Sequence, residues 1–207
     1  MNIFVVDRNP IEAADALCDI HVNKMIVESM QMLTTALKQS GLLAPNELPF
    51  RKDGITRYSG NAHPHHPCTK WVGELLDKPT FYFHGQEIQT VQRWIGGVVI
   101  HAPNYCWLYS HTEELLSCFK RRYGKTHGCL DAFKALPKGS YQGHTDVKNF
   151  VQAMPDAFKI DSVYISDSIK AYRQFYHTKT FAKWAKGSDA PDWWMQPLAD
   201  LVGQVKE

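Results

Sequence analysis

The chain has 207 residues and a formal net charge of +2 at neutral pH. This length predicts one domain with a substantial core, and the balanced charge excludes a general polycation, so any contact with nucleic acid must come from local basic patches. Five scattered cysteines without a Cys-x-x-Cys pair indicate reduced thiols rather than a disulfide framework. No apolar run approaches the roughly 18 residues of a membrane helix. No signal peptide is expected either, because Asp7 and Arg8 interrupt the apolar start.

The first part of the chain predicts a short buried segment followed by helix. Residues 1–6 are apolar and are expected to form an extended piece. Asn9 is expected to cap a helix that has Pro10 at its first position. The helical pattern continues, with a kink near Asp19, until a Ser-Gly pair at 40–41 ends it.

The middle of the chain is expected to be less regular. Residues 42–68 are rich in Pro, Gly, Asn and His and predict a long connection, followed by a helical turn at 69–76. Residues 78–102 are ambiguous, since 80–83 has the pattern of an extended segment and 86–94 has a helical one.

The second half predicts further helices. A long helix is expected to start at Pro103 and to end at Gly124, because apolar residues repeat at helical spacing between them. A short helix at 130–136 and a last long helix over 166–186 follow. The fold class is therefore mainly α: a compact helical bundle with a short extended N-terminal segment and long irregular loops.

The helix after Asp19 carries an unusual polar face. At 100° per residue, a stripe about 80° wide contains His21, Lys24, Glu28, Gln31 and Thr35. A His, a Lys and a Glu on one rigid element are the parts of an acid–base site, so Glu28, His21 and Lys24 are the catalytic candidates. The simpler interpretation is an exposed i,i+4 Lys–Glu pair, which stabilises a helix by only about 0.3–0.5 kcal/mol.

A histidine-rich loop follows in the long connection. Three histidines and a thiol lie close together, and such side chains bind zinc, so an alternative zinc site would use His63, His65, His66 and Cys68. The spacing matches no zinc module, and no cofactor is our first expectation. Two other interpretations are a solvated loop with one capping histidine, and a loop whose His66 or His63 faces the stripe as a general acid or phosphate ligand.

Two basic segments are candidates for phosphate binding. Arg122, Lys125 and His127 lie around the end of a predicted helix, where the helix dipole by itself favours cations. A nucleotide P-loop is excluded there because the upstream glycine is missing. Over 171–184 aromatic residues, most of them expected in the core, interleave with cations, and Arg173 is expected to reach a cleft or a nucleic-acid backbone.

Most of the chain resembles a family of uncharacterised bacteriophage proteins. The segments that carry this resemblance are 17–37, 66–72, 104–108, 122–127, 152–156 and 171–173. Residues 73–102 are extra in this chain and form a candidate inserted subdomain or lid within one domain, 1–207. The resemblance implies a phage origin and the host cytoplasm, and it supplies no activity.

The spacing of His21 and Glu28 also resembles that of the pyrimidine-dimer DNA glycosylases of the endonuclease V type. Residues 107–124 are similar to a later helix of those compact helical enzymes. In that family a free terminal amine attacks the sugar C1′ to give a Schiff base, the Glu stabilises it, and a base is flipped out of the duplex.

This chain departs from that family at two positions. Val27 stands where the family has arginine, and Asn2 is too large for ready removal of Met1. The apolar segment 1–6 is also expected to bury the amine. These departures argue against the amine step and favour a site centred on Glu28.

We therefore expect a phage enzyme that acts on bases of DNA, either a glycosylase or a base-modifying enzyme. Glu28 would be the acid–base group or oxocarbenium stabiliser, His21 its partner and Lys24 an electrostatic tuner. The alternatives are an enzyme on a free nucleotide or small phosphorylated substrate, and a non-catalytic phage protein that binds DNA or a host protein. The candidate substrate- or phosphate-binding residues are Gln31, Asn61, His63, His66, Lys70, Asn104, Trp107, Arg122, Lys125, His127 and Arg173.

Overall fold

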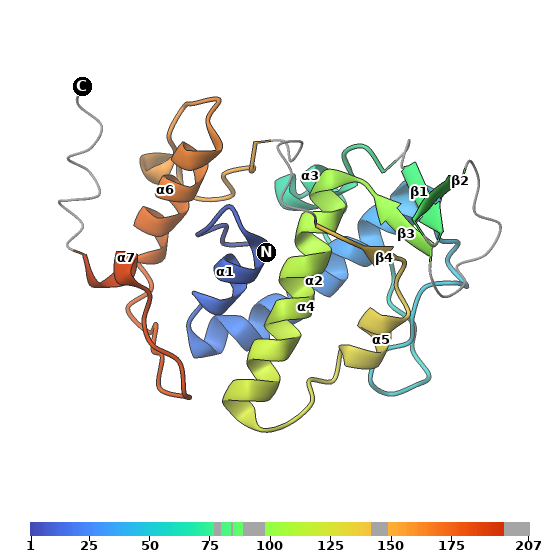
Figure 1. Cartoon of the computed structure of the whole chain (residues 1–207), viewed down its shortest axis with the longest axis horizontal. Helices are drawn as coiled ribbons and strands as arrows, with labels where there is room; N and C mark the ends of the chain where they lie inside the picture. Colours follow the sequence, from blue (N-terminus) through green and yellow to red (C-terminus); the bar gives the residue numbers. More distant parts are fainter. Residues whose placement is uncertain (77–79, 84, 89–97, 142–148, 197–207) are drawn as a thin grey trace.

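Two long helices form the centre of the molecule. The computed structural model describes residues 1–76, 80–83, 85–88, 98–141 and 149–196. Helix α2 (Asp19–Gln39) packs against α4 (Pro103–Tyr123), while α1 (Pro10–Asp15) packs on α4 and α3 (Pro67–Gly73) on α2 (Figure 1). The other helices are α5 (Leu130–Lys134), the 3-10 helix η1 (Asp156–Phe158), α6 (Ile165–Tyr176) and α7 (Asp192–Met195). The mainly α fold class is therefore confirmed.

The core lies between these helices. Val22, Ile26, Met30, Leu33 and Leu37, on the α2 face opposite the polar stripe, are all completely buried, as the periodicity predicts. Within the described part of the chain, no helix is both long and apolar enough to cross a membrane.

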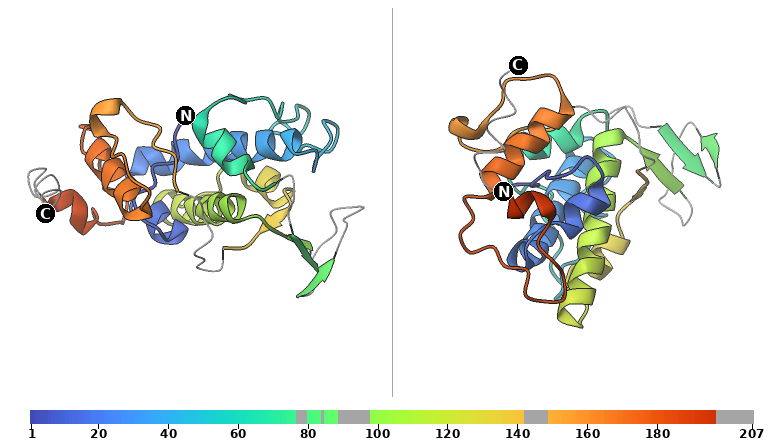
Figure 2. Two further views of the ribbon diagram at one scale, coloured as in Figure 1. Left: turned by 90° about the horizontal axis from the view of Figure 1, so that it is seen from above. Right: turned by 60° about the vertical axis from the view of Figure 1, so that its left-hand side comes forward.

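A small sheet lies at one end of the helical body. Its strand order is β2-β1-β3-β4, formed by β1 (Thr80–Phe83), β2 (Gln86–Ile88), β3 (Val98–His101) and β4 (Lys138–Gly139). β1 pairs antiparallel with β2 and β3, and β3 pairs parallel with β4. Figure 2 shows β1–β3 standing away from the helices.

The strand prediction at 80–83 is confirmed, but the helix prediction is wrong at 86–88, which form β2. Gly85, with φ 81°, precedes β2, so the chain reverses there and pairs with β1. This pairing overrides the local helical pattern. The rest of that prediction, 89–94, lies outside the described residues.

Local signals place most helix ends correctly. The Asn9 side chain accepts a hydrogen bond from the Ile11 amide at 3.0 Å, and Pro10 opens α1. Gly124, in the left-handed conformation at φ 65°, ends α4. The predicted kink near Asp19 is a full break, since α1 ends at Asp15 before α2 begins.

Two further predicted elements differ from the structure. Residues 3–6 are buried as expected but are turned rather than extended, because the Asn2 side chain accepts the amides of Ile3 and Phe4, and Phe4 has φ 52°. Helix α6 ends at Tyr176 instead of continuing to 186, and the Thr178 hydroxyl bonds back to the Phe175 carbonyl at 2.8 Å.

Candidate functional site

The polar stripe of α2 is organised around Glu28. The Glu28 side chain is 13% exposed, and its Oε1 lies 3.4 Å from Nζ of Lys24, whose side chain is 59% exposed. The i,i+4 pair that the simpler interpretation requires is therefore present. It is one part of a larger arrangement, because the other carboxylate oxygen faces the start of the chain.

The first two residues contact Glu28 directly. Oε2 accepts a hydrogen bond from the Asn2 amide at 2.7 Å and lies 4.0 Å from the Met1 amine nitrogen. The Met1 side chain is only 2% exposed while the residue as a whole is partly exposed, so solvent reaches its main-chain atoms. The structure therefore buries the Met1 side chain and leaves part of its main chain in contact with solvent. The chain start lies over α2, between α3 and α6 (Figure 2).

Several contacts from distant elements fix this position. The Asn2 side-chain amide donates to the Ala153 carbonyl at 2.7 Å, and the Thr69 hydroxyl of α3 lies 3.8 Å from the Met1 sulfur. Nε of Arg173 on α6 donates to the Val6 carbonyl at 2.8 Å. The amine is thus held beside the carboxylate by the tertiary fold, and Arg173 positions the N-terminal segment rather than reaching a cleft.

The histidine-rich loop also reaches this site. Thr35 on α2 exchanges two hydrogen bonds with the backbone of Ala62, at 3.1 and 3.3 Å, which ties the loop to the stripe. His66 caps α3, since its Nδ1 accepts the Cys68 amide at 3.1 Å, so the neutral ring carries its proton on Nε2. Burial, the terminal amine and His63 lower the pKa of His66, while Glu28 acts in the opposite direction. His66 therefore lies within range of the charges of the terminal amine and of Glu28.

His21 forms a buried wall of the same stripe. Its Nδ1 is hydrogen-bonded at 2.6 Å to the Tyr176 hydroxyl, which also accepts the Cys18 amide. The ring stacks on Phe4 with centroids 4.5 Å apart. Burial, followed by the charges of Lys24 and Lys179, lowers the pKa of His21 to about 4, so the imidazole is neutral at pH 7.

Three further predicted binding residues lie in the core with their polar groups engaged inside the protein. The Asn104 amide donates to the Trp71 carbonyl, and the Trp107 indole donates to the Arg8 carbonyl, both at 2.8 Å. The Arg122 side chain is 2% exposed and donates to the main chain at the junction of α1 and α2, at 2.6 and 2.7 Å. The prediction that these three residues contact substrate or phosphate is therefore wrong, because their hydrogen-bond donors are bonded to main-chain carbonyls inside the protein.

The other predicted residues lie on the surface. Lys70 on α3, Lys125 after α4, and Asn61 and His63 on the histidine-rich loop are exposed. Gln31 and His127 come together, because both line a cavity of about 380 Å³.

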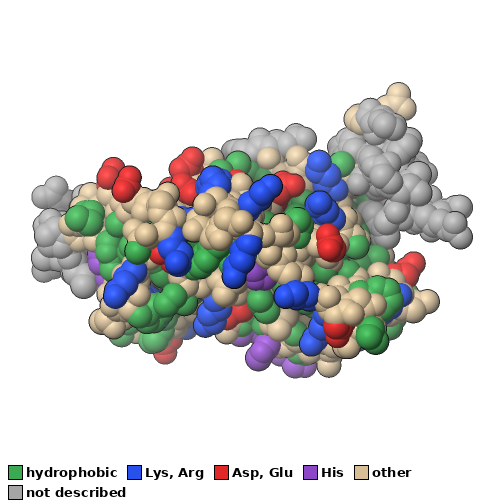
Figure 3. All heavy atoms as spheres, turned by 90° about the horizontal axis from the view of Figure 1, so that it is seen from below, with side chains coloured by type: hydrophobic (Ala, Val, Ile, Leu, Met, Phe, Trp, Pro, Cys, Tyr) green, Lys and Arg blue, Asp and Glu red, His purple; other side chains and the backbone are tan. Residues whose placement is uncertain are grey.

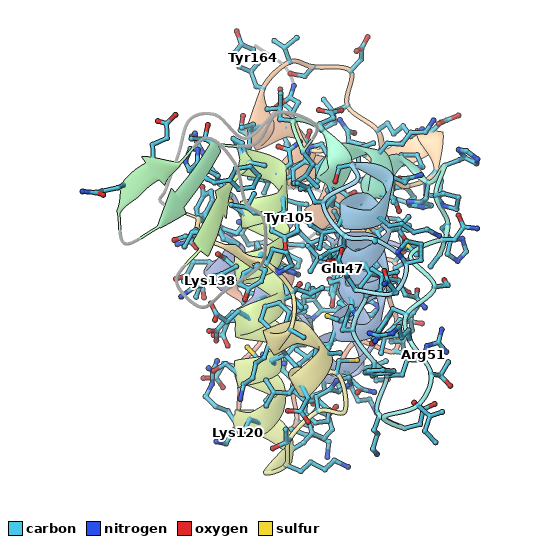
Figure 4. The ribbon with its side chains drawn as sticks, turned by 90° about the vertical axis from the view of Figure 1, so that its right-hand side faces the viewer. Glu47, Arg51, Tyr105, Lys120, Lys138 and Tyr164 are labelled. Atoms are coloured by element: carbon cyan, nitrogen blue, oxygen red, sulfur yellow. The ribbon has the colours of Figure 1, made fainter. Side chains whose placement is uncertain are left out.

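The same cavity is lined by two cations that were not among the predicted binding residues. Arg51 and Lys52, from the irregular connection after α2, line it together with Tyr58. Figure 4 shows Arg51 on the loop that runs beside α2, and Figure 3 shows Lys and Arg side chains distributed across the lower face of the molecule. Two adjacent cations in a predicted loop are too common a pattern to single out before the fold places them.

The residues of the zinc alternative do not converge. Among the described residues, three or more metal-ligating atoms come within 4.8 Å of one another at Asp15, Glu114 and Cys118 rather than at His63, His65, His66 and Cys68. In that cluster Arg121 already pairs with both carboxylates at 2.8 Å. The geometry therefore gives the zinc alternative no support.

Comparisons with family models, with curated proteins and with solved structures find no significant match to this chain. The chemistry of the site therefore follows from the chemical groups that it brings together. A carboxylate beside an amine that the fold holds in place provides a nucleophile with an adjacent base or charge stabiliser. The neutral His66 ring, within range of both charges, adds a hydrogen-bond donor through Nε2.

Proposed function

We propose that this protein is a phage enzyme that acts on bases of DNA, as a glycosylase or a related base-modifying enzyme. The observation that carries the proposal is the Met1 amine 4.0 Å from the Glu28 carboxylate, on a helix stripe that continues into a cavity lined by cations. The seven-residue spacing of His21 and Glu28 that resembles pyrimidine-dimer glycosylases supports the same function.

In the proposed reaction the unprotonated amine attacks C1′ of the target nucleotide. The C1′–N bond breaks, its electron pair leaves with the base, and the amine nitrogen becomes bonded to the sugar. The C1′–O4′ bond then opens, O4′ takes a proton, and the nitrogen lone pair forms the C=N bond of a Schiff base, which borohydride can reduce. Glu28 stabilises the positive charge that develops on the sugar and accepts the proton that the amine loses. The departing base takes its proton from solvent, because the neutral His66 ring can donate a hydrogen bond through Nε2 but cannot act as an acid.

The proposal predicts that Glu28→Gln lowers the rate of base release by about 100-fold or more, since the amide cannot accept a proton or balance the charge. The amide oxygen can still accept the Asn2 hydrogen bond, so folding is preserved. The assay incubates the protein with duplexes that carry damaged or phage-modified bases and identifies released bases by mass.

Glu47→Gln is the matched control, because Glu47 is exposed and caps the Ala44 amide at 2.7 Å in a loop beside α2 (Figure 4). It should leave the rate unchanged. A Glu28→Gln protein with the wild-type rate would remove Glu28 from the chemistry.

The nucleophile is tested separately. Borohydride reduction during turnover should join the protein to the DNA at Met1, and one glycine added before Met1 should abolish this product by displacing the amine. Intact mass establishes which residue begins the purified chain. Base release without any trapped adduct would favour an enzyme that uses Glu28 to activate water instead.

A second candidate is an enzyme on a free nucleotide or small phosphorylated substrate. The cavity of about 380 Å³ favours it, since Arg51, Lys52 and His127 suit a phosphate and the volume matches a small ligand. Competition assays separate the two candidates. Inhibition of DNA processing by mononucleotides at micromolar concentration would support this second candidate.

A further inference from the structure

A small, rigid hairpin carries the two cations that line the cavity next to the α2 stripe. Phe50 and Arg57 form an antiparallel bridge, and the Arg51 amide donates to the Thr56 carbonyl at 2.7 Å. The Arg57 guanidinium lies over the Phe50 ring at 3.8 Å. We call residues 50–57 the basic hairpin.

The tip of the basic hairpin is fixed from within. The Asp53 carboxylate accepts the amides of Ile55 and Thr56 at 2.9 and 2.8 Å, and Gly54 takes φ 66° to close the turn. This arrangement holds Ile55 outward with 82% of its surface exposed. A single exposed apolar residue is ordinary on a protein surface, so its meaning depends on what surrounds it.

The cations of the basic hairpin line a cavity that also borders the α2 stripe. Arg51 and Lys52 line the cavity that reaches Gln31, one helical turn beyond Glu28, and this cavity has no carboxylate among its described lining residues. Arg51 and Lys52 also line a second cavity of about 450 Å³. The loop after α4 and helix α5 form its other side, and Asp131 of α5 is the acidic residue among its described lining residues.

The stem of Lys52 is fixed in place as well. A Cβ at Gly128 would lie 2.8 Å from Cδ of Lys52, so the glycine lets the lysine cross the loop after α4. The basic hairpin is thus a rigid, cationic projection beside the candidate site.

We propose that the basic hairpin engages duplex DNA, with Arg51 and Lys52 on phosphates and Ile55 inserted into the base stack beside the nucleotide that is moved toward Glu28. This inference rests on the proposed function. An enzyme that acts on a base must take that base out of the stack, and apolar side chains inserted between base steps are a known means of unstacking them. The two cations on the strand that leads into the tip would hold the backbone in register.

The test uses a duplex with 2-aminopurine beside a mismatched or modified base, whose fluorescence rises when the base unstacks. We expect the full-length protein to raise the fluorescence. Ile55→Ser should reduce that rise by about fivefold or more, because a short polar side chain cannot hold the stack open. Its affinity for single-stranded DNA should stay within about twofold, because phosphate contacts supply that binding.

Val163→Ser is the matched control, because Val163 is also a β-branched apolar residue, 79% exposed, on the loop before α6. It should leave both signals unchanged. Arg51→Gln and Lys52→Gln should each lower the slope of log affinity against log salt by about 1 while retaining the fluorescence rise at saturation.

The outcomes separate the two proposals. If the wild-type protein releases bases and Ile55→Ser behaves like wild type in fluorescence and affinity, the insertion of Ile55 into the base stack is wrong and the proposed function stands. If the wild-type protein neither binds DNA in a salt-dependent way nor releases any base, both fail. Loss of the fluorescence rise in Ile55→Ser alone, with base release also reduced, supports the hairpin.

Discussion

At Glu28, one carboxylate faces three nitrogen groups of different chemistry. The Asn2 amide fixes one oxygen by a hydrogen bond of 2.7 Å, Lys24 approaches the other at 3.4 Å, and the terminal amine lies at 4.0 Å. The amide contact orients the carboxylate, and the exposed Lys24 contributes little to stability in water. The group left for chemistry is the amine, and the proposed nucleophilic step depends on it.

At the same scale we predict that His21 titrates at about pH 4 in an NMR pH series, since burial and two nearby ammonium groups disfavour its charged form. Lys179→Met should raise the pKa of His21 by removing one of these charges. Lys183→Met, an exposed lysine of the same segment, should not change it. A wild-type His21 that titrates between pH 6 and 7 would contradict the buried, Tyr176-bonded geometry.

At the scale of the elements, the junction of α1 and α2 is held by the end of α4. The Arg122 guanidinium donates to the carbonyls of Leu17 and Asp15 and lies 3.4 Å from the Asp19 carboxylate. Asp19 in turn accepts the Ala185 amide at 2.8 Å, so the segment after α6 joins the same cluster. Arg122 therefore has a structural role, whereas Lys125, three residues further along the chain, is exposed to solvent.

We predict that Arg122→Met lowers the free energy of unfolding by about 3 kcal/mol, because it leaves buried carbonyls and the Asp19 carboxylate without their partner. Lys125→Met should change it by no more than about 0.5 kcal/mol, since its side chain is exposed. Urea unfolding followed by circular dichroism measures both. Equal effects of the two substitutions would show that Arg122 is not a structural cation.

At the scale of the whole molecule, two buried histidines couple stability to pH. Burial lowers the pKa of His111 to about 3, and His21 titrates at about 4, both below the usual value of 6.5. Neither ring nitrogen of His111 has a hydrogen-bond partner among the described residues. Between pH 6.5 and 4 the unfolded chain therefore binds more protons than the folded one, so this stability is present above pH 6.5 and lost as the pH falls.

We predict that the free energy of unfolding falls by several kcal/mol between pH 6.5 and pH 4, on the order of 2–3 kcal/mol for each of the two histidines. His111→Phe removes one of the two titrating histidines, so the free energy of unfolding should fall about half as steeply with pH. His65→Gln, a change at an exposed histidine, should leave it unchanged. Denaturant titrations at half-unit pH steps measure the slopes, and a pH-independent wild type would contradict the prediction.

The sequence by itself determined the elements whose signals are local. The apolar spacing of α2, the Asn9 cap and the Gly124 stop each act within a few residues, so α1, α2 and α4 could be predicted, as could the stripe that carries Glu28. Tertiary structure alone decided what lies against that stripe. The Met1 amine, the His66 ring and the cations of residues 50–57 come from segments far from α2 in sequence, and no short-range pattern encodes their meeting. For the same reason β2 and the role of Arg122 could not be predicted, because strand pairing and buried ion pairs depend on partners that only the fold supplies.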